Sequence, residues 1–214
     1  MSAHAYSPAE RDAVYRVIRE RRDMRHFRPS PVAPEVRQRL LAAAHQAPSV
    51  GLMQPWRFIR ITQTDLRQRL HALVEAERLR TAEALGERGD AFMRLKVEGI
   101  LDCGELWVAA LMDAREPYIL GRPLPEMDLA SVACAIQSLW LAARAEGLGL
   151  GWVSLFDPLA VAQLLGIPHG GQPVAILCIG QVDAFYDAPM LESEGRDRRR
   201  AVADCLFENI WGQS

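Results

Sequence analysis

The 214-residue sequence is first informative through what it lacks. Its four cysteines are widely spaced and form no C-x-x-C pair, so neither a disulfide framework nor a zinc site is predicted, and a reducing compartment fits best. No apolar run approaches the roughly 20 residues of a membrane span. Residues 1–15 contain no apolar signal-peptide core. We therefore expect a cytoplasmic protein that makes no membrane contact.

A global excess of positive charge is also absent. The chain has 25 Lys and Arg against 27 Asp and Glu, a net charge of -2, and an isoelectric point near 6.2. Binding to a nucleic-acid backbone requires a concentrated positive surface, so no nucleic-acid partner is expected.

Several common catalytic motifs are missing. The sequence has no G-x-G-x-x-G after a strand, no P-loop, no H-E-x-x-H and no G-x-S-x-G. Its histidines lie far apart without the spacing of metal ligands, and we assign no metal to them. These residues are His4, His26, His45, His71 and His169.

What the sequence does contain is a local concentration of arginine at residues 21–27, R-R-D-M-R-H-F. Three guanidinium groups this close together repel one another unless an anion lies among them, and arginine matches phosphate in shape and charge. Asp23 either pairs with Arg21 or Arg25 or is kept for proton chemistry. A solvated basic helix end is the alternative interpretation of this segment.

A second basic cluster, R-D-R-R-R at residues 196–200, lies near the other end of the chain. A phosphate held by both clusters would account for each of them. The alternative is a solvated helix start.

Apolar periodicity and turn residues predict one domain with alternating helices and strands. Helices are expected from Pro8 to Arg21 and over residues 34–47, 64–85, 91–98, 128–146 and 158–165. Strands are expected over residues 58–62, 106–112, 152–155 and 174–180, with Ser154 on the third. The 128–146 helix is apolar almost all round, so it should lie in the core or between subunits. Residues 118–127 could form a flap or a segment that crosses a dimer.

Three motifs in this order resemble the flavin-dependent nitroreductase superfamily, and the resemblance covers nearly the whole chain. They are R-R-D-M-R-H-F at 21–27, A-P-S-V-G-L-M-Q-P-W at 47–56 and A-R-A-E-G-L-G-L-G-W-V-S at 143–154. The resemblance implies an α+β fold with a central β-sheet flanked by helices, in a homodimer that binds FMN at the subunit interface.

The resemblance also implies the residues that hold the flavin. Its phosphate and ribityl ligands would be Arg21, Arg22, Arg25 and Arg199, with Arg196 and Arg198 less firmly placed. Further FMN contacts would come from Asp23, Met24, Pro48, Ser49, Leu95, Lys96 and Ser154.

The sequence departs from the usual nitroreductase pattern at Asp23, where serine is common, and at Leu52, where asparagine is common. With the G-L-G-L-G-W-V-S segment, Met24 and residues 96–99, these departures resemble the branch that fragments its flavin. That branch uses an aspartate and a serine as its functional pair, which implies Asp23 and Ser154 as catalytic residues.

The activity implied is an oxygen-dependent fragmentation of reduced FMN, which is consumed as substrate. It would yield 5,6-dimethylbenzimidazole, the lower ligand of cobalamin, and erythrose 4-phosphate. NAD(P)H would act only indirectly, through a separate flavin reductase as a further partner.

Two other functions remain open from the sequence: an NAD(P)H-dependent nitroreductase or flavin reductase, and a non-catalytic FMN-binding module. At the level of residues, Asp23 could form only a salt bridge, and the Ser154 hydroxyl could simply be satisfied by backbone.

Overall fold

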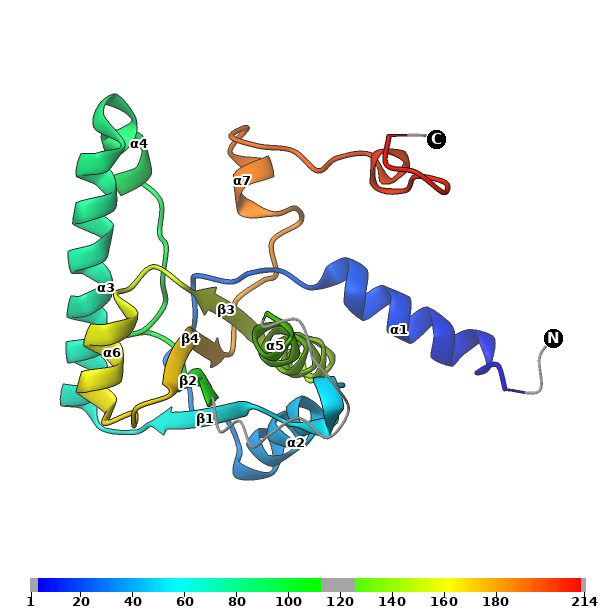
Figure 1. The fold of residues 1–214 in the computed structure, drawn as a ribbon, viewed down its shortest axis with the longest axis horizontal. Coiled ribbons are helices and arrows are strands. Elements are labelled where there is room, and N and C mark those ends of the chain that lie inside the picture. Colours follow the sequence, from blue (N-terminus) through cyan, green and yellow to red (C-terminus); the bar gives the residue numbers. More distant parts are fainter. Residues whose placement is uncertain (1–3, 113–125, 213–214) are drawn as a thin grey trace.

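A four-stranded antiparallel sheet separates two layers of helices in the computed structural model (Figure 1), which describes residues 4–112 and 126–212. The strand order is β1-β2-β4-β3. The strands are β1 (Trp56–Ile61), β2 (Glu105–Met112), β3 (Gly149–Val153) and β4 (Gly171–Gly180). The expected α+β architecture with a helix-flanked central sheet is confirmed.

One face of the sheet is covered by α2 (Pro34–His45) and α5 (Met127–Ala145). Helix α5 carries eight buried residues, from Asp128 to Ala143, and packs on both α2 and the sheet. Of the two positions expected from its nearly continuous apolar character, in the core or between subunits, the structure confirms the core.

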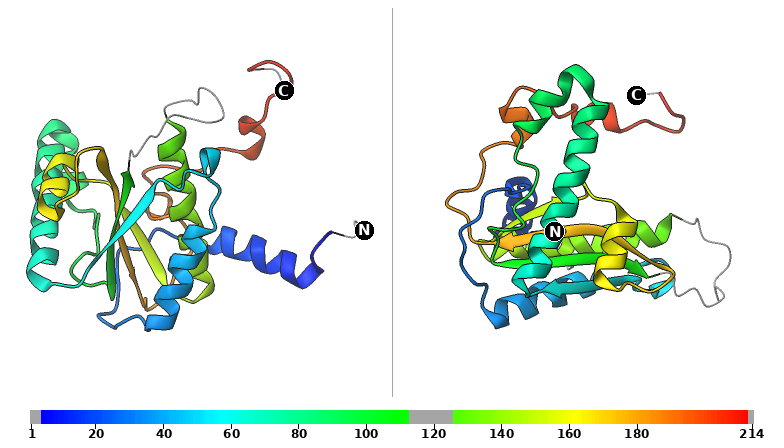
Figure 2. Two further views of the ribbon diagram at one scale, coloured as in Figure 1. Left: turned by 60° about the horizontal axis from the view of Figure 1, so that its bottom comes forward. Right: turned by 90° about the vertical axis from the view of Figure 1, so that its left-hand side faces the viewer.

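The other face is covered by α3 (Thr64–Ala84) and α6 (Pro158–Leu165), as the views in Figure 2 show. The short helix α4 (Gly89–Met93) follows α3 through the 3₁₀ turn η2 (Gly86–Arg88) and packs back against it. Leu70 and Val74 of α3 are fully buried against β2 and β4 residues such as Val108 and Ile176. Both faces of β2 are therefore covered, which is consistent with its nearly continuous apolar sequence.

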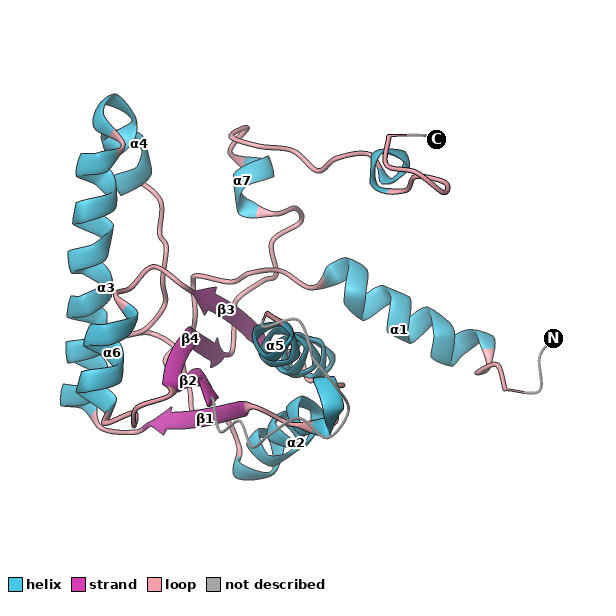
Figure 3. Cartoon of the chain, in the orientation of Figure 1, coloured by secondary structure: helices cyan, strands magenta, loops and turns pink. Residues whose placement is uncertain are grey.

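Helix α1 (Pro8–Glu20) extends away from the sheet, and the chain after α7 (Met190–Ser193) also leaves the core (Figure 3). Ser7 and Glu10 form a capping box at the start of α1. None of its residues is buried, although Val14 and Ile18 form an apolar stripe. The tail contains one further 3₁₀ turn, η3 (Val202–Cys205), and is exposed.

Two local expectations need correction. The helix predicted over residues 91–98 ends at Met93, because the Arg78 guanidinium holds the Met93 and Leu95 carbonyls and residues 96–99 run without regular structure. Strand β3 ends at Val153, so Ser154 follows the strand rather than lying on it, and its side chain is exposed.

The 3₁₀ turn η1 (Val50–Leu52) leads into β1, which begins at Trp56, two residues earlier than predicted. Residues 118–125 of the predicted flap lie outside the described part of the chain. Among the described residues, no helix combines the length and apolarity needed to cross a bilayer.

Candidate active site

The arginine-rich segment after α1 extends the sheet at its β3 edge. Asp23 forms a parallel bridge with Leu150, and the Met24 N–H donates to the Leu150 carbonyl at 3.0 Å. A Cβ atom on Gly151 would lie 2.3 Å from the Met24 carbonyl oxygen. The glycine-rich sequence before Ser154 is thus needed so that the arginine segment can approach β3 closely.

A cavity of about 430 Å³ opens where this segment meets the 95–97 loop and the region around α7. That volume is within the range of small-molecule sites. The cavity is lined by Arg21, Arg22, Asp23, Arg25, Leu95, Val97, Tyr186, Pro189, Met190, Leu191 and Arg199. Six of these were predicted from the sequence, and the two arginine clusters converge here through Arg199.

Asp23 lies in a network that fixes both carboxylate oxygens. The Trp152 N–H donates to Oδ1 at 2.9 Å, and Arg25 Nη2 donates to Oδ2 and to the Trp152 carbonyl. The salt bridge to Arg25 considered as an alternative role is therefore present. Burial nevertheless raises the pKa of Asp23, although Arg25, the Trp152 N–H and Arg21 oppose the shift.

Arg21 and Arg199 face the same cavity and repel each other. Burial lowers the pKa of Arg21; Asp23 opposes that change, and the charges of Arg199 and Arg22 lower the pKa further. An anion bound between them would relieve this repulsion.

Trp140 of α5 contacts both Arg21 and Arg22. The Arg21 guanidinium carbon lies 4.4 Å from the Trp140 ring centroid, and the indole N–H donates to the Arg22 carbonyl at 3.2 Å. Trp140 is 7% exposed, so its position is fixed by the core. This role could not be predicted from the sequence, because an apolar helix gives no signal of what its tryptophan contacts.

The cavity is lined by arginine donors suited to an anionic ligand. Within the described residues, Arg25 Nη1 and Arg22 Nε are buried without a hydrogen-bond partner. Buried donors normally have partners, so these two atoms fit a ligand with acceptor oxygens or nitrogens.

Other predicted residues do not line this cavity. Met24 is 1% exposed and faces the core, Lys96 forms an ion pair with Asp102 at 2.7 Å, and Ser154 lies beyond β3. Pro48 and Ser49 lie at the start of η1, where the Ser49 hydroxyl accepts the Gln54 N–H. Arg196 and Arg198 are also absent from the lining.

Tyr186 is the clearest site residue that the sequence analysis missed. Its hydroxyl lies 2.7 Å from His26 Nδ1 and accepts the Arg25 N–H at 3.2 Å. It follows β4 in an irregular segment, where no local pattern points to the cavity.

The chain belongs to the nitroreductase family, whose model matches residues 18–181. The family consists of enzymes, and the oxidoreductase class is consistent with the family and with the relatives named below. Two relatives are named 5,6-dimethylbenzimidazole synthase. The protein from Rhodobacter capsulatus is 43% identical, over 89% of this chain and 93% of its own length. The protein from Rhodospirillum rubrum is 42% identical, over 91% and 94%.

A solved structure of iodotyrosine deiodinase bound to FMN and 3-iodo-L-tyrosine has the same fold. Its TM-score is 0.73 at 21% identity, with coverage of 92% of this chain and 100% of that chain. At this identity the likeness establishes the fold alone.

Proposed function

We propose that this protein fragments reduced FMN in the presence of dioxygen and forms 5,6-dimethylbenzimidazole and erythrose 4-phosphate. The observation that carries the proposal is Asp23, a carboxyl group with a raised pKa in a cavity lined by four arginines. The identity of 42–43% to two named synthases over about 90% of the chain supports the same assignment.

Bound reduced FMN would supply the electrons that activate dioxygen. Arg21, Arg22 and Arg199 would bind its phosphate, and Arg25 Nη1 would donate to an acceptor on the flavin. Asp23 would take up and release the proton that the fragmentation of the flavin requires. Each of its oxygens accepts one hydrogen bond and retains a second acceptor position, so the group can take a proton without leaving its network.

Ser154 is proposed as the second functional residue on resemblance only. It lies two residues after Trp152. The Trp152 N–H donates to Asp23, and the Trp152 carbonyl accepts a hydrogen bond from Arg25, which also pairs with Asp23. A shift of the residues after β3 when FMN binds would be needed to bring its hydroxyl to the ligand.

Because FMN is consumed, the protein needs a continuing supply of reduced flavin. We propose a separate NAD(P)H-dependent flavin reductase as that source. The competing function, a nitroreductase that keeps its flavin, would instead oxidise NAD(P)H itself over many turnovers.

We further propose a homodimer with FMN at the subunit interface. Apolar side chains are exposed along α1, at η1 and in the tail, where a second copy could cover them. Val14 and Ile18 are 51% and 48% exposed, and Leu52 and Trp211 are 80% and 88% exposed. Pro48 and Ser49 do not line the cavity of their own chain, so their proposed flavin contacts require a partner subunit.

Ile18→Glu is expected to dissociate this dimer at micromolar protein, because it places a charge in an apolar contact. Sedimentation velocity measures the outcome. The control is Arg16→Gln, on another side of α1, where an ion pair with Glu20 is lost while Glu20 keeps its pair with Arg144. A wild-type monomer that binds FMN would contradict the dimer.

Trp140→Phe is expected to weaken FMN binding by about 1 kcal/mol, because it removes the hydrogen bond to the Arg22 carbonyl and places a weaker ring under Arg21. Riboflavin binding should change little, since it lacks the phosphate. Trp107→Phe is the matched control: Trp107 is 4% exposed in the same core and donates to Glu105 rather than to the arginine segment. Equal effects of the two substitutions would assign Trp140 to the core alone.

The proposed activity is tested by mixing the protein with chemically reduced FMN in air and separating the products by chromatography. We expect 5,6-dimethylbenzimidazole to accumulate as FMN disappears. Complete recovery of FMN, together with sustained oxidation of NAD(P)H, would favour the nitroreductase instead.

A further inference from the structure

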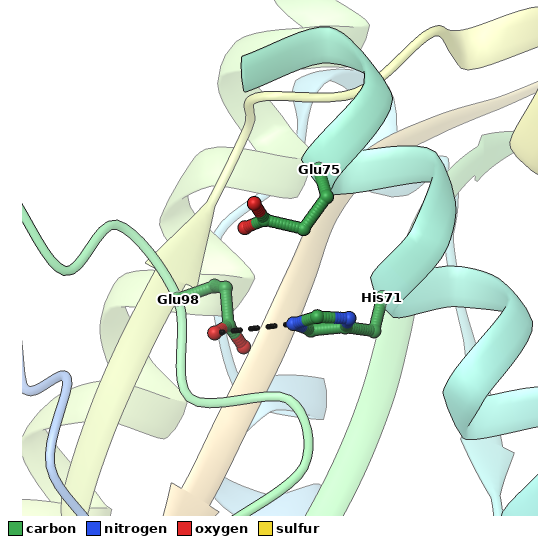
Figure 4. A group of neighbouring side chains, drawn as sticks. All are labelled: His71, Glu75 and Glu98. Atoms are coloured by element: carbon green, nitrogen blue, oxygen red, sulfur yellow. Dashed lines mark ion pairs between the residues drawn. The ribbon is translucent and has the colours of Figure 1, made fainter. Parts of the chain in front are cut away.

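His71, Glu75 and Glu98 form a cluster on the side of the sheet covered by α3 (Figure 4). His71 and Glu75 are one helical turn apart, so they lie on one face of α3. Glu98 comes from the irregular segment between α4 and β2 and points toward that face. No metal was predicted at His71, because Glu98 is distant in the sequence and only the fold brings it beside His71.

We propose that these three side chains bind a divalent transition-metal ion of the zinc class. One ligand atom from each residue lies within 4.8 Å of the other two. In tetrahedral geometry, metal–ligand bonds of about 2.0–2.2 Å place two ligands about 3.3–3.6 Å apart. Side-chain rotations that shorten the widest separation by somewhat more than about 1 Å would therefore close the site. One imidazole and two carboxylates are ligands that zinc and similar ions accept.

The present contacts leave ligand atoms available. Glu98 Oε2 accepts the Ile100 N–H, while Oε1 lies 3.6 Å from His71 Nε2, which is longer than a hydrogen bond. The Glu75 oxygens lie 3.2 and 3.3 Å from one Arg78 nitrogen, and the other Arg78 nitrogen donates to the Met93 and Leu95 carbonyls. These bonds would orient the two carboxylates as outer partners do in metal sites.

Charge and access also favour a cation. The cluster contains two carboxylates, and Arg78 pairs with Glu75 alone of these two. The side chains of His71, Glu75 and Glu98 are 28%, 31% and 13% exposed, which permits entry of an ion and leaves room for water ligands. The ion would link α3 to the segment that carries Leu95 and Val97 to the candidate active site.

The test is a Zn²⁺ titration of the whole chain after chelator treatment, and the binding is measured by isothermal titration calorimetry. It is done in a Cys134→Ser, Cys205→Ser background, because these exposed thiols could also bind zinc. One site per chain is expected. His71→Ala and Glu98→Gln should each weaken it at least tenfold, and Ca²⁺ should not compete because it prefers oxygen ligands.

His169→Ala and Glu83→Gln are matched controls at exposed positions and should leave Zn²⁺ binding unchanged. Circular dichroism confirms that each variant is folded. The proposal is overturned if the parent binds no Zn²⁺ at micromolar concentrations, or if His71→Ala and His169→Ala bind it equally. The cluster would then be a histidine–carboxylate ion pair. The readout does not involve FMN, so it is independent of the proposed activity.

Discussion

Asp23→Asn is expected to bind reduced FMN and to form about 10²- to 10⁴-fold less 5,6-dimethylbenzimidazole per bound flavin, the range lost when a positioned acid or base is removed. Asparagine keeps the size of the side chain, and its single amide oxygen can still accept the Trp152 N–H, while its NH2 group cannot replace the oxygen that accepts from Arg25. It cannot take up a proton at neutral pH. Because one negative charge is removed beside the arginines, FMN should bind at least as tightly as in the wild type.

The measurement combines an FMN titration with a single-turnover assay on fully bound reduced flavin. Asp183→Asn is the matched control, since Asp183 pairs with Arg28 on the surface and does not line the cavity. If Asp23 only orients Arg25, the Asp23→Asn protein should bind FMN more weakly yet convert what it binds. A normal yield per bound flavin would remove Asp23 from the chemistry.

The second large effect concerns Arg21. Arg21→Ala should weaken FMN binding by about 1.5–3 kcal/mol, because it would remove the proposed charge-assisted hydrogen bond from this partly buried arginine to the phosphate. Riboflavin binding should stay within about twofold, since riboflavin carries no phosphate. Arg199→Ala should change binding in the same direction by a smaller amount, because Arg199 is exposed.

Parallel titrations with FMN and riboflavin separate a phosphate contact from general damage to the site. Arg57→Ala is a suitable control, because Arg57 donates to the Gln54 and Trp56 carbonyls and does not line this cavity. Equal losses for FMN and riboflavin would show that Arg21 does not contact the phosphate.

The fold was largely predictable from local patterns. The capping box at Ser7, the apolar runs of β2 and β4 and the nearly all-apolar α5 each carry a direct physical signal. The prediction was wrong for residues 94–98, where the contacts of Arg78 with the Met93 and Leu95 carbonyls end the helix. Such a tertiary contact leaves no trace in the periodicity of the segment.

The residues that line the candidate site were predictable only where charged side chains are concentrated in the sequence. Arginines and an aspartate in five residues are an unusual combination, and the convergence of Arg199 on them follows from the expectation of one shared anion. Tyr186, Val97 and Trp140 could not be found, because their roles depend on which irregular segments and helix faces come together. The same reason hid Glu98 beside His71.

The most direct test of the central claim uses reduced FMN labelled with carbon-13 in its two ring methyl groups. Excess protein is mixed with this flavin in air, and the products are analysed by mass spectrometry. With the wild type, both labelled carbons should appear in 5,6-dimethylbenzimidazole, in an amount approaching the amount of flavin lost. The Asp23→Asn variant should not give this result. Recovery of all the label in intact FMN would contradict the account and identify a flavin-retaining member of the family.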